Sequence, residues 1–329
     1  MSKRVLSIQS HVVSGYVGNK AAAFPLQLLG FDVDVINSVQ FSNHTGYGSW
    51  EGDVLQGDML LKLVDGMDKN ELLTDETGHI LTGYIGSESF LRAVVTIVRQ
   101  MKAANPQVRY VCDPVMGDIG RFYVPEQLLK VYIDEVIPLA DVLTPNQFEV
   151  EQLTGVRIDS IDDAQRACCI LHDLGVPSVL ITSIVFPTNA QQSQDSIGIF
   201  ASKRFHGIET DSYQDEHQIL YVPKLPGQFT GTGDIVAALW LALTASSNDV
   251  SSLGQKLEQL AGTMNAIVTR TYQASLEKLQ KQGISLLEEP EDEATRKKIV
   301  RSREMQLVQS ASDIMNPPTS FKATKITER

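Results

Sequence analysis

The sequence alternates short apolar runs with longer amphipathic stretches, and this alternation restricts the fold more than any other feature of the chain. The apolar runs occupy residues 5–8, 33–36, 79–81, 110–112, 142–144 and 179–182, and runs of this length are typical of buried strands. Helix-like stretches lie at 21–29, 87–104, 147–154 and 162–174, the last followed by Gly175 as a C-cap. The alternation predicts an α/β fold, with a mostly parallel central sheet and helices on both faces.

Two further stretches depart from this alternation. Residues 196–225 are rich in β-formers and turn residues, so we expect an antiparallel edge there. Residues 283–303 contain the run Glu-Glu-Pro-Glu-Asp-Glu followed by Arg-Lys-Lys, which predicts a charged, exposed insertion. The sequence has no internal repeat of about 20 to 50 residues. We therefore predict a single domain that spans residues 1–329.

Composition restricts the class of partner. A net charge of -12 and a pI near 5.0 argue against nucleic acid, because phosphate-backbone binding uses clustered Lys and Arg. No apolar run approaches the roughly 18 to 20 residues that span a bilayer, and the first residues lack a signal peptide's apolar region. The three cysteines, Cys112, Cys168 and Cys169, lack metal-ligand spacing and fit a reducing compartment. We expect no membrane contact and a cytoplasmic location.

The most specific local signal is the segment 229–234, Phe-Thr-Gly-Thr-Gly-Asp, followed by an apolar helical run at 235–243. Gly231 and Gly233 leave room for a phosphoryl group beside the backbone. The start of the helix offers unpaired N–H groups and a positive dipole end. Asp234 can then accept a proton from a hydroxyl group while the amides hold developing negative charge. Alternatively, Asp234 is an N-cap residue, and the segment alone leaves the two interpretations equal.

The segment 229–234 resembles the Gly-Thr-Gly-Asp motif of the ribokinase superfamily, which supplies an anion hole and a catalytic aspartate. Other segments narrow the resemblance to pyridoxal kinases. They are Arg-Val-Leu-Ser-Ile-Gln-Ser-His-Val-Val-Ser-Gly-Tyr-Val-Gly-Asn at 4–19, Asn-Ser-Val-Gln-Phe-Ser-Asn-His-Thr-Gly-Tyr at 37–47, Leu-Thr-Gly-Tyr at 81–84, Tyr-Val-Cys-Asp-Pro-Val-Met-Gly-Asp at 110–118, Tyr-Val-Pro-Glu at 123–126, Leu-Thr-Pro-Asn-Gln-Phe-Glu at 143–149 and Ile-Thr-Ser at 181–183. These segments occur in the family's order and reach to about residue 271.

This resemblance implies a ribokinase-like fold without a separate lid domain, a homodimer, and ATP-dependent phosphorylation of a vitamer in vitamin B6 salvage. The expected substrates are pyridoxal, pyridoxine and pyridoxamine, and phosphorylation of the 5′-hydroxymethyl group of pyridoxal gives pyridoxal 5′-phosphate and ADP. The catalytic residues implied are Asp234 and the anion-hole residues Gly231, Thr232 and Gly233.

The same resemblance implies a vitamer pocket. Ser10 and Thr45 would hydrogen-bond the pyridine ring and its substituents, and the remaining lining residues would be Val17, Val39, Phe41, His44, Tyr84 and Asp234. This mixture suits a flat heteroaromatic ligand, which needs apolar faces and a few aimed polar groups. For His44 a purely structural place in a loop is nearly as well supported, because a single histidine has no required geometry.

For the nucleotide, the resemblance gives Asp118 and Glu149 to Mg²⁺ or another divalent cation, and Asp113 and Thr144 to a monovalent cation, K⁺ or Na⁺. Oxygen ligands of this kind suit Mg²⁺ beside phosphates, although Asp-Pro also favours a simple turn. The nucleotide contacts implied are Asp118, Tyr123, Asn146, Glu149, Thr182, Ser183, Leu225, Thr232 and Gly233. Asn146 also suits a helix start.

The chain departs from the family pattern at two places. Residues 119–122, Ile-Gly-Arg-Phe, form a shorter flap than the glycine-rich loop of animal pyridoxal kinases, and Arg121 adds a positive charge there. Thr230 replaces a valine that some relatives have beside the ring. Two alternative functions stay open: a hydroxymethylpyrimidine kinase, and a non-catalytic sensor that binds the vitamer. The segments 10–12 and 41–46 argue against the first, and the combination of a base with a metal site argues against the second.

Overall fold

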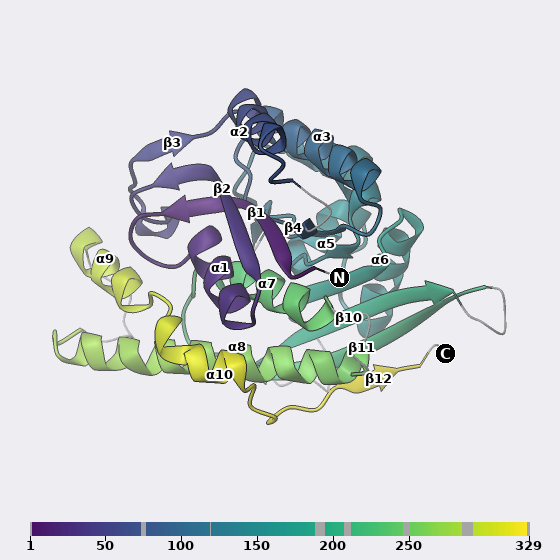
Figure 1. The fold of residues 1–329 in the computed structure, drawn as a ribbon. Helices are drawn as coiled ribbons and strands as arrows, with labels where there is room; N and C mark the ends of the chain where they lie inside the picture. The colour runs from purple at the N-terminus through teal and green to yellow at the C-terminus, as the bar shows by residue number, and fades with distance from the viewer. Residues whose placement is uncertain are drawn as a thin grey trace.

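The computed structural model describes residues 2–73, 77–118, 120–187, 195–206, 212–245, 251–284 and 292–327. Within them, one ten-stranded sheet has the order β12-β11-β10-β9-β8-β5-β4-β1-β2-β3 (Figure 1). The strands of its centre run parallel: β1 (Arg4–Val12), β2 (Asp32–Phe41), β4 (Thr77–Thr82), β5 (Arg109–Cys112), β8 (Val142–Leu143) and β9 (Ser178–Ile184). The mostly parallel sheet is therefore confirmed.

Antiparallel strands close both edges of the sheet. One edge is β3 (Gly52–Val54), paired with β2. The other is built by β10 (Ser196–His206), β11 (Tyr213–Pro223) and β12 (Thr324–Ile326), which confirms the antiparallel edge predicted at 196–225. A separate two-stranded hairpin, β6 (Gly117–Asp118) with β7 (Arg121–Phe122), occupies the place of the short flap.

Helices cover both faces of the sheet (Figure 1). One layer contains α2 (Gly57–Lys69), α3 (Glu88–Ala104), α4 (Gln127–Val131), η2 (Tyr132–Val136), η3 (Ile137–Leu139), α5 (Gln147–Thr154) and α6 (Ile161–Asp173). The other contains α1 (Asn19–Leu28), α7 (Thr232–Thr244), α8 (Leu253–Gln280) and α10 (Ala311–Met315). Each layer has its own apolar core, because alternate residues of a strand point to opposite faces. In β5, Tyr110 and Cys112 join one core and Val111 joins the other.

The charged segment predicted as an insertion falls partly on residues 285–291, which lie outside the described residues. Its described part contains α9 (Glu293–Ser302), which begins after the N-cap Asp292. The charges of α9 are mostly exposed, while Ile299 and Ser302 are buried, and Ser302 Oγ lies 2.6 Å from Ser275 Oγ of α8. The insertion and the single-domain boundaries stay predictions. In the described part of the chain, no helix is long and apolar enough to cross a membrane.

Candidate active site

The carboxyl ends of the parallel strands meet at one edge of the sheet, where ligands usually bind in open α/β folds. Several predicted site residues lie there: Ser10 near the end of β1, Asp113 directly after β5, Thr144 directly after β8, and Thr182 with Ser183 near the end of β9. The start of α7 reaches the same edge, since a Cβ atom on Gly233 would lie 3.6 Å from Asp113 Oδ2. The topology therefore brings the motif at 229–234 to the carboxylates after β5.

The start of α7 has the form expected for an anion site. Its N-cap is Gly231, whose φ of 92° lies in the left-handed region and whose missing side chain avoids overlap with the carbonyl oxygen of Tyr16. Asp234 lies in the first turn, and no side chain caps this helix. The capping interpretation of Asp234 is therefore wrong. The carboxylate instead lies near the backbone N–H of Gly18 on a distant segment, and this N–H favours its charged form.

Gly18 lies between two elements of the site, strand β1 and helix α7. It is the N-cap of α1 with a φ of 53°, and any Cβ atom there would overlap the carbonyl oxygen and the hydroxyl group of Ser10. Ser10 and Asp234 thus both contact Gly18, from β1 and from α7. The sequence interpretation did not assign a role to Gly18. Its presence in the Val-Gly-Asn run at 17–19 was a signal, but the positive φ and the close contact with Ser10 could not be inferred from the run alone.

A small apolar cluster lies beside this junction, since a Cβ atom on Gly231 would lie 3.4 Å from Val17 Cγ1. Val12, Val17, Val39 and Phe41 form a small core of their own, and Tyr84 packs against it. Apart from Val12, these side chains are the ones predicted to line the vitamer pocket. They come from β1, from the loop before α1, from β2 and from the loop after β4.

The 3₁₀ turn η1 (Thr45–Tyr47) lies close to the start of α7. A Cβ atom on Gly46 would lie 2.8 Å from His44 Nδ1 and 3.5 Å from Thr230 Oγ1, so the turn, His44 and Thr230 are neighbours. His44 is buried, whereas Thr45 is exposed. The loop after β2 therefore reaches the segment that precedes Asp234, as the predicted pocket requires.

Buried carboxylates crowd the end of β5. Loss of hydration raises the pKa of Asp113 well above its ordinary value, and the neighbouring charges of Glu149 and Asp234 raise it further. Burial raises the pKa of Glu149 to about 7 and that of Asp234 to about 6, although backbone N–H groups oppose the rise in both cases. Asp234 keeps part of its surface open to solvent. Close carboxylates that oppose one another's ionisation form a site in which a cation is stabilised.

Glu149 connects the start of α5 to the flap, the hairpin of β6 and β7, through hydrogen bonds. Asn146 and Glu149 form a capping box, and Glu149 also accepts hydrogen bonds from the N–H groups of Met116 and Gly117 at 2.9 and 3.4 Å. Asn146 Nδ2 donates to the carbonyl oxygen of Gly117 at 2.8 Å. Asp118, the next residue, is exposed on the hairpin. Glu149 thus positions the backbone that carries Asp118.

The oxygen atoms near Asp113 fit a bound cation. Thr144 Oγ1 is buried and has no hydrogen bond of good geometry among the described residues, although the hydroxyl group is near enough to favour the charged form of Asp113. A buried hydroxyl oxygen without a partner is costly unless a ligand satisfies it. Thr144 and Asp113 therefore supply the oxygen donors that a monovalent cation would need.

Comparison with known proteins shows which family the chain belongs to. The sequence model of the family described as phosphomethylpyrimidine kinase matches residues 70–253. Pyridoxal kinase of Arabidopsis thaliana is 45% identical over 322 residues, 98% of this chain and 94% of the relative. The chain belongs to the pyridoxal kinase family. It is 42% identical to pyridoxal kinase of Homo sapiens, with 98% of both chains covered. The solved pyridoxal kinase of Leishmania donovani in complex with ADP and pyridoxamine superposes with a TM-score of 0.82 at 31% identity, covering 99% of this chain and 100% of that one.

Membership of the pyridoxal kinase family confirms the ribokinase-like fold that the motif at 229–234 indicated, and it makes the chain a kinase. The remaining nucleotide residues lie around the flap and β9. Tyr123 is 58% exposed, and its pKa is raised by burial of part of the ring and by the nearby charges of Asp118 and Glu149. Thr182 donates through its N–H and its hydroxyl group to the carbonyl oxygen of Pro145, at 2.9 and 3.4 Å.

Ser183 and Leu225 are less closely connected to the carboxylates. Ser183 is half-buried in β9, and Leu225 is half-buried two residues beyond β11. In the described ranges, no hydrogen bond or ion pair joins either side chain to Asp113, Glu149 or Asp234. Their contact with a nucleotide stays a prediction for this pyridoxal kinase family member.

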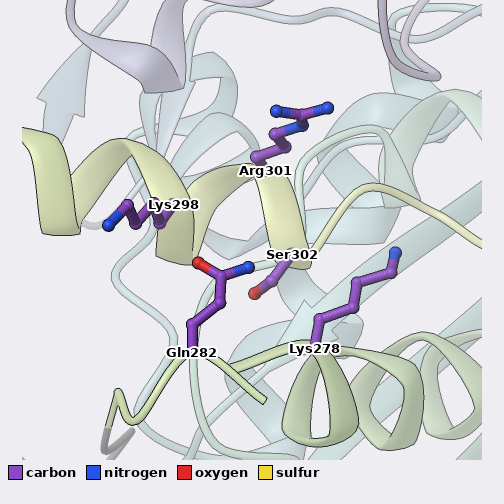
Figure 2. Close-up of a pocket in the computed structure, with 5 residues that line it drawn as sticks. All are labelled: Lys278, Gln282, Lys298, Arg301 and Ser302. Atoms are coloured by element: carbon purple, nitrogen blue, oxygen red, sulfur yellow. The ribbon is translucent and has the colours of Figure 1, made fainter. Parts of the chain in front are cut away.

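Two other polar features lie outside the predicted site. A hollow of about 450 Å³ between α8 and α9 is lined by Lys278, Gln282, Lys298, Arg301 and Ser302 (Figure 2). None of these residues belongs to the predicted site, and they provide no carboxylate to act as a base. Within the described ranges, Cys169, Asp215 and His217 offer ligand atoms within 4.8 Å of one another. Arg204 already binds both oxygens of Asp215 at 2.7 and 2.8 Å, and its positive charge disfavours a metal ion there.

Proposed function

We propose that this chain transfers the γ-phosphoryl group of ATP to the 5′-hydroxymethyl group of pyridoxal, and also to that of pyridoxine and pyridoxamine. The products with pyridoxal are pyridoxal 5′-phosphate and ADP, a step of vitamin B6 salvage. The position of Asp234 carries the proposal. Its carboxylate does not cap the helix, lies near the Gly18 N–H, and stands at a helix N-terminus beside the apolar cluster that contains Val17.

The proposed chemistry follows from this position. The vitamer ring lies among Val17, Val39, Phe41 and Tyr84, with His44, Ser10 and Thr45 as polar contacts, and its hydroxymethyl group is directed towards Asp234. As the hydroxyl oxygen bonds to the γ-phosphorus, its proton passes to Asp234 and the bond between phosphorus and the β-γ bridging oxygen breaks to release ADP. The backbone N–H groups of Gly231, Thr232 and Gly233 stabilise the charge on the transferred group.

We propose that Asp118 and Glu149 act on Mg²⁺ or another divalent cation, and that Asp113 and Thr144 hold K⁺ or Na⁺. When bound, these cations offset the negative charge of the phosphate groups. Both oxygens of Glu149 already accept backbone N–H groups. Its proposed contribution is therefore to fix the flap and to add negative charge, while Asp118, exposed on the hairpin, is the proposed carboxylate ligand.

The nucleotide is proposed to lie along the segment from the flap to β9. Asn146, Thr182 and Ser183 are placed near its phosphates together with Thr232 and Gly233, Tyr123 closes over it, and Leu225 borders the adenine. Support comes from the hydrogen bonds that join Asn146 to Gly117 and Thr182 to Pro145. The edge-to-face contact of Phe122 with Phe148, with centroids 5.1 Å apart, holds the flap against α5.

A homodimer and a cytoplasmic location are part of the proposal. Exposed apolar side chains are found on and close in sequence to the edge strand β3, namely Trp50, Val54 and Met59. Such side chains favour burial against a second copy. The free cysteines Cys112, Cys168 and Cys169 suit a reducing compartment.

A coupled ADP-release assay tests the function. With saturating ATP and Mg²⁺, we compare pyridoxal, pyridoxine, pyridoxamine and hydroxymethylpyrimidine. The proposal predicts that the vitamers give the higher kcat/KM. The match to the phosphomethylpyrimidine kinase family model makes hydroxymethylpyrimidine the second candidate, and a higher kcat/KM for that compound would replace the proposal. Vitamer binding by calorimetry without ADP release would instead support the sensor.

A further inference from the structure

The carboxylate of Glu304 lies between two loops of the vitamer pocket, although its own position is far along the chain. Glu304 follows α9 and is only 18% exposed. Its Oε1 atom accepts a hydrogen bond from Tyr47 Oη at 2.9 Å and lies 3.2 Å from His44 Nε2. Its Oε2 atom accepts the backbone N–H of Tyr16 at 3.3 Å. One carboxylate therefore joins the loop before α1 to the loop that contains η1.

The surrounding backbone is shaped to admit this carboxylate. Gly15 has a φ of 98°, and a Cβ atom there would lie 2.5 Å from Glu304 Oε2. Helix α9 packs against η1, and a Cβ atom on Gly48 would overlap the guanidinium group of Arg296. Glycine at positions 15 and 48 thus allows the segment 292–304 to approach both loops. This close approach argues that the contact is a built feature and not a chance pairing of surface groups.

The contact of Glu304 with His44 determines which ring nitrogen of His44 faces the carboxylate. A carboxylate that is ionised can only accept hydrogen bonds, so Glu304 requires a proton on His44 Nε2. His44 Nδ1 is then left for another partner. This atom is buried and has no hydrogen-bond partner among the described residues, and it lies on the side of the turn where Thr230 is the neighbour. A buried polar atom without a partner is the atom that a ligand is expected to satisfy.

Glu304 is ionised under ordinary conditions. Burial alone would raise its pKa, but the hydrogen bonds from His44, Tyr47 and the Tyr16 N–H outweigh this effect and hold the pKa below the ordinary value. The charge therefore persists in the folded protein, and with it the proton on His44 Nε2. Removing the charge would remove the preference for this orientation of the ring without removing any bulk from the core.

We propose that Glu304 is a positioning residue of the vitamer site, which holds His44 so that Nδ1 is directed to a polar substituent of the vitamer ring. This inference rests on the proposed function, because it assigns the pocket beside Asp234 to a pyridine vitamer. Tyr47 provides a second hydrogen bond that keeps the turn carrying Thr45 in place. Vitamer affinity should thus depend on a charge contributed by the C-terminal part of the chain.

The test uses Glu304→Gln in the full-length protein. Glutamine keeps the length and can still accept from Tyr47, but it has no charge to hold the His44 proton. We expect the KM for pyridoxal to rise about tenfold, the scale of one hydrogen bond to a charged group, with the KM for ATP and kcat within about twofold of wild type. Glu258→Gln is the matched control. Glu258 likewise accepts from Lys322 and from the Ala323 N–H, both at 3.1 Å, but on α8 and away from the pocket, so all constants should stay unchanged.

A double-mutant cycle with His44→Asn separates positioning from general bracing. If Glu304 acts through His44, adding Glu304→Gln to His44→Asn raises the KM for pyridoxal by less than about twofold. Three results would overturn the proposal. The first is an unchanged KM for pyridoxal in Glu304→Gln, and the second is an equal rise of the KM for pyridoxal and the KM for ATP. The third is a rise of the KM for pyridoxal that is as large in the His44→Asn background as in the wild-type background. A wild-type protein that releases no ADP with any vitamer would overturn the proposed function itself, which keeps the two failures distinct.

Discussion

The carboxylate of Asp234 lies near the backbone N–H of Gly18, which opposes the rise of its pKa on burial. Gly18 is the N-cap of α1 and Asp234 lies in the first turn of α7, and these two helices pack side by side. The positive ends of two helix dipoles therefore meet at one carboxylate. This arrangement favours negative charge at the point where a phosphoryl group would be transferred.

The first prediction concerns Gly18. Gly18→Ala adds a side chain at positive φ and also forces overlap with Ser10, whereas Gly283→Ala has a φ of 68° but no neighbouring atom within 4 Å. Both variants incur the cost of positive φ, which is about 1 to 2 kcal/mol. We expect urea unfolding to show a loss for Gly18→Ala that exceeds the loss for Gly283→Ala by roughly 2 kcal/mol or more. Equal losses would mean that the backbone at Gly18 can move away from Ser10.

The second prediction concerns the divalent cation. Asp118→Ala should shift the Mg²⁺ dependence of ADP release to higher concentration at saturating ATP, because it removes an exposed carboxylate that we propose lies beside the phosphates. Asp53→Ala, on the exposed edge strand β3, is the control and should leave the Mg²⁺ curve unchanged. If the two curves coincide, Asp118 belongs to the turn of the hairpin and has no part in the cation site.

The third prediction concerns the monovalent cation. Thr144→Val replaces a buried hydroxyl group that has no hydrogen bond of good geometry in the described chain by a methyl group of similar size. We expect a higher K⁺ or Na⁺ concentration for half-maximal activity, with the Mg²⁺ curve unchanged. Without added monovalent salt of either kind, thermal melting should show no loss of stability, since no good hydrogen bond is lost. A lowered melting temperature with unchanged K⁺ and Na⁺ curves would make Thr144 a structural residue.

The fourth prediction concerns pH and stability. Burial raises the pKa of Asp234 from 3.8 to about 6, so the folded protein binds more protons than the unfolded chain between these values. The contribution of Asp234 to the free energy of unfolding therefore falls as the pH rises from 3.8 to about 6, and the full destabilisation is reached above about pH 6. Without ligands and with a chelator present, we expect Asp234→Asn to raise the free energy of unfolding at pH 7.5 by roughly 1 kcal/mol, a value reduced because the group is partly exposed. The gain should disappear near pH 4. A gain of equal size at both pH values would point to a cause other than the charge.

The sheet could be predicted from the sequence because buried parallel strands are continuous apolar runs, and 110–112 and 179–182 needed no tertiary information. The start of α7 at Gly231 was also predictable, since glycine before an apolar helical run is a local signal. Other features depend on contacts between distant segments. The position of the N-cap at Gly231, which excludes Asp234 as the cap, is seen only in the folded helix. The contacts of Glu304 with His44 and Tyr47 likewise required the packing of α9 on η1. The long helix α8 was missed because its apolar positions are interrupted by many polar residues.

Single-turnover kinetics of Asp234→Asn tests the central claim most directly. Asparagine keeps the shape and still places an oxygen atom near the Gly18 N–H, but it cannot take a proton from the hydroxymethyl group. We predict a fall in the rate of phosphoryl transfer of about 10² or more, with calorimetric Kd values for pyridoxal and for the nucleotide within about threefold of wild type and no loss of thermal stability. A stable variant that binds both ligands and keeps near wild-type turnover would contradict the assignment of Asp234 as the base.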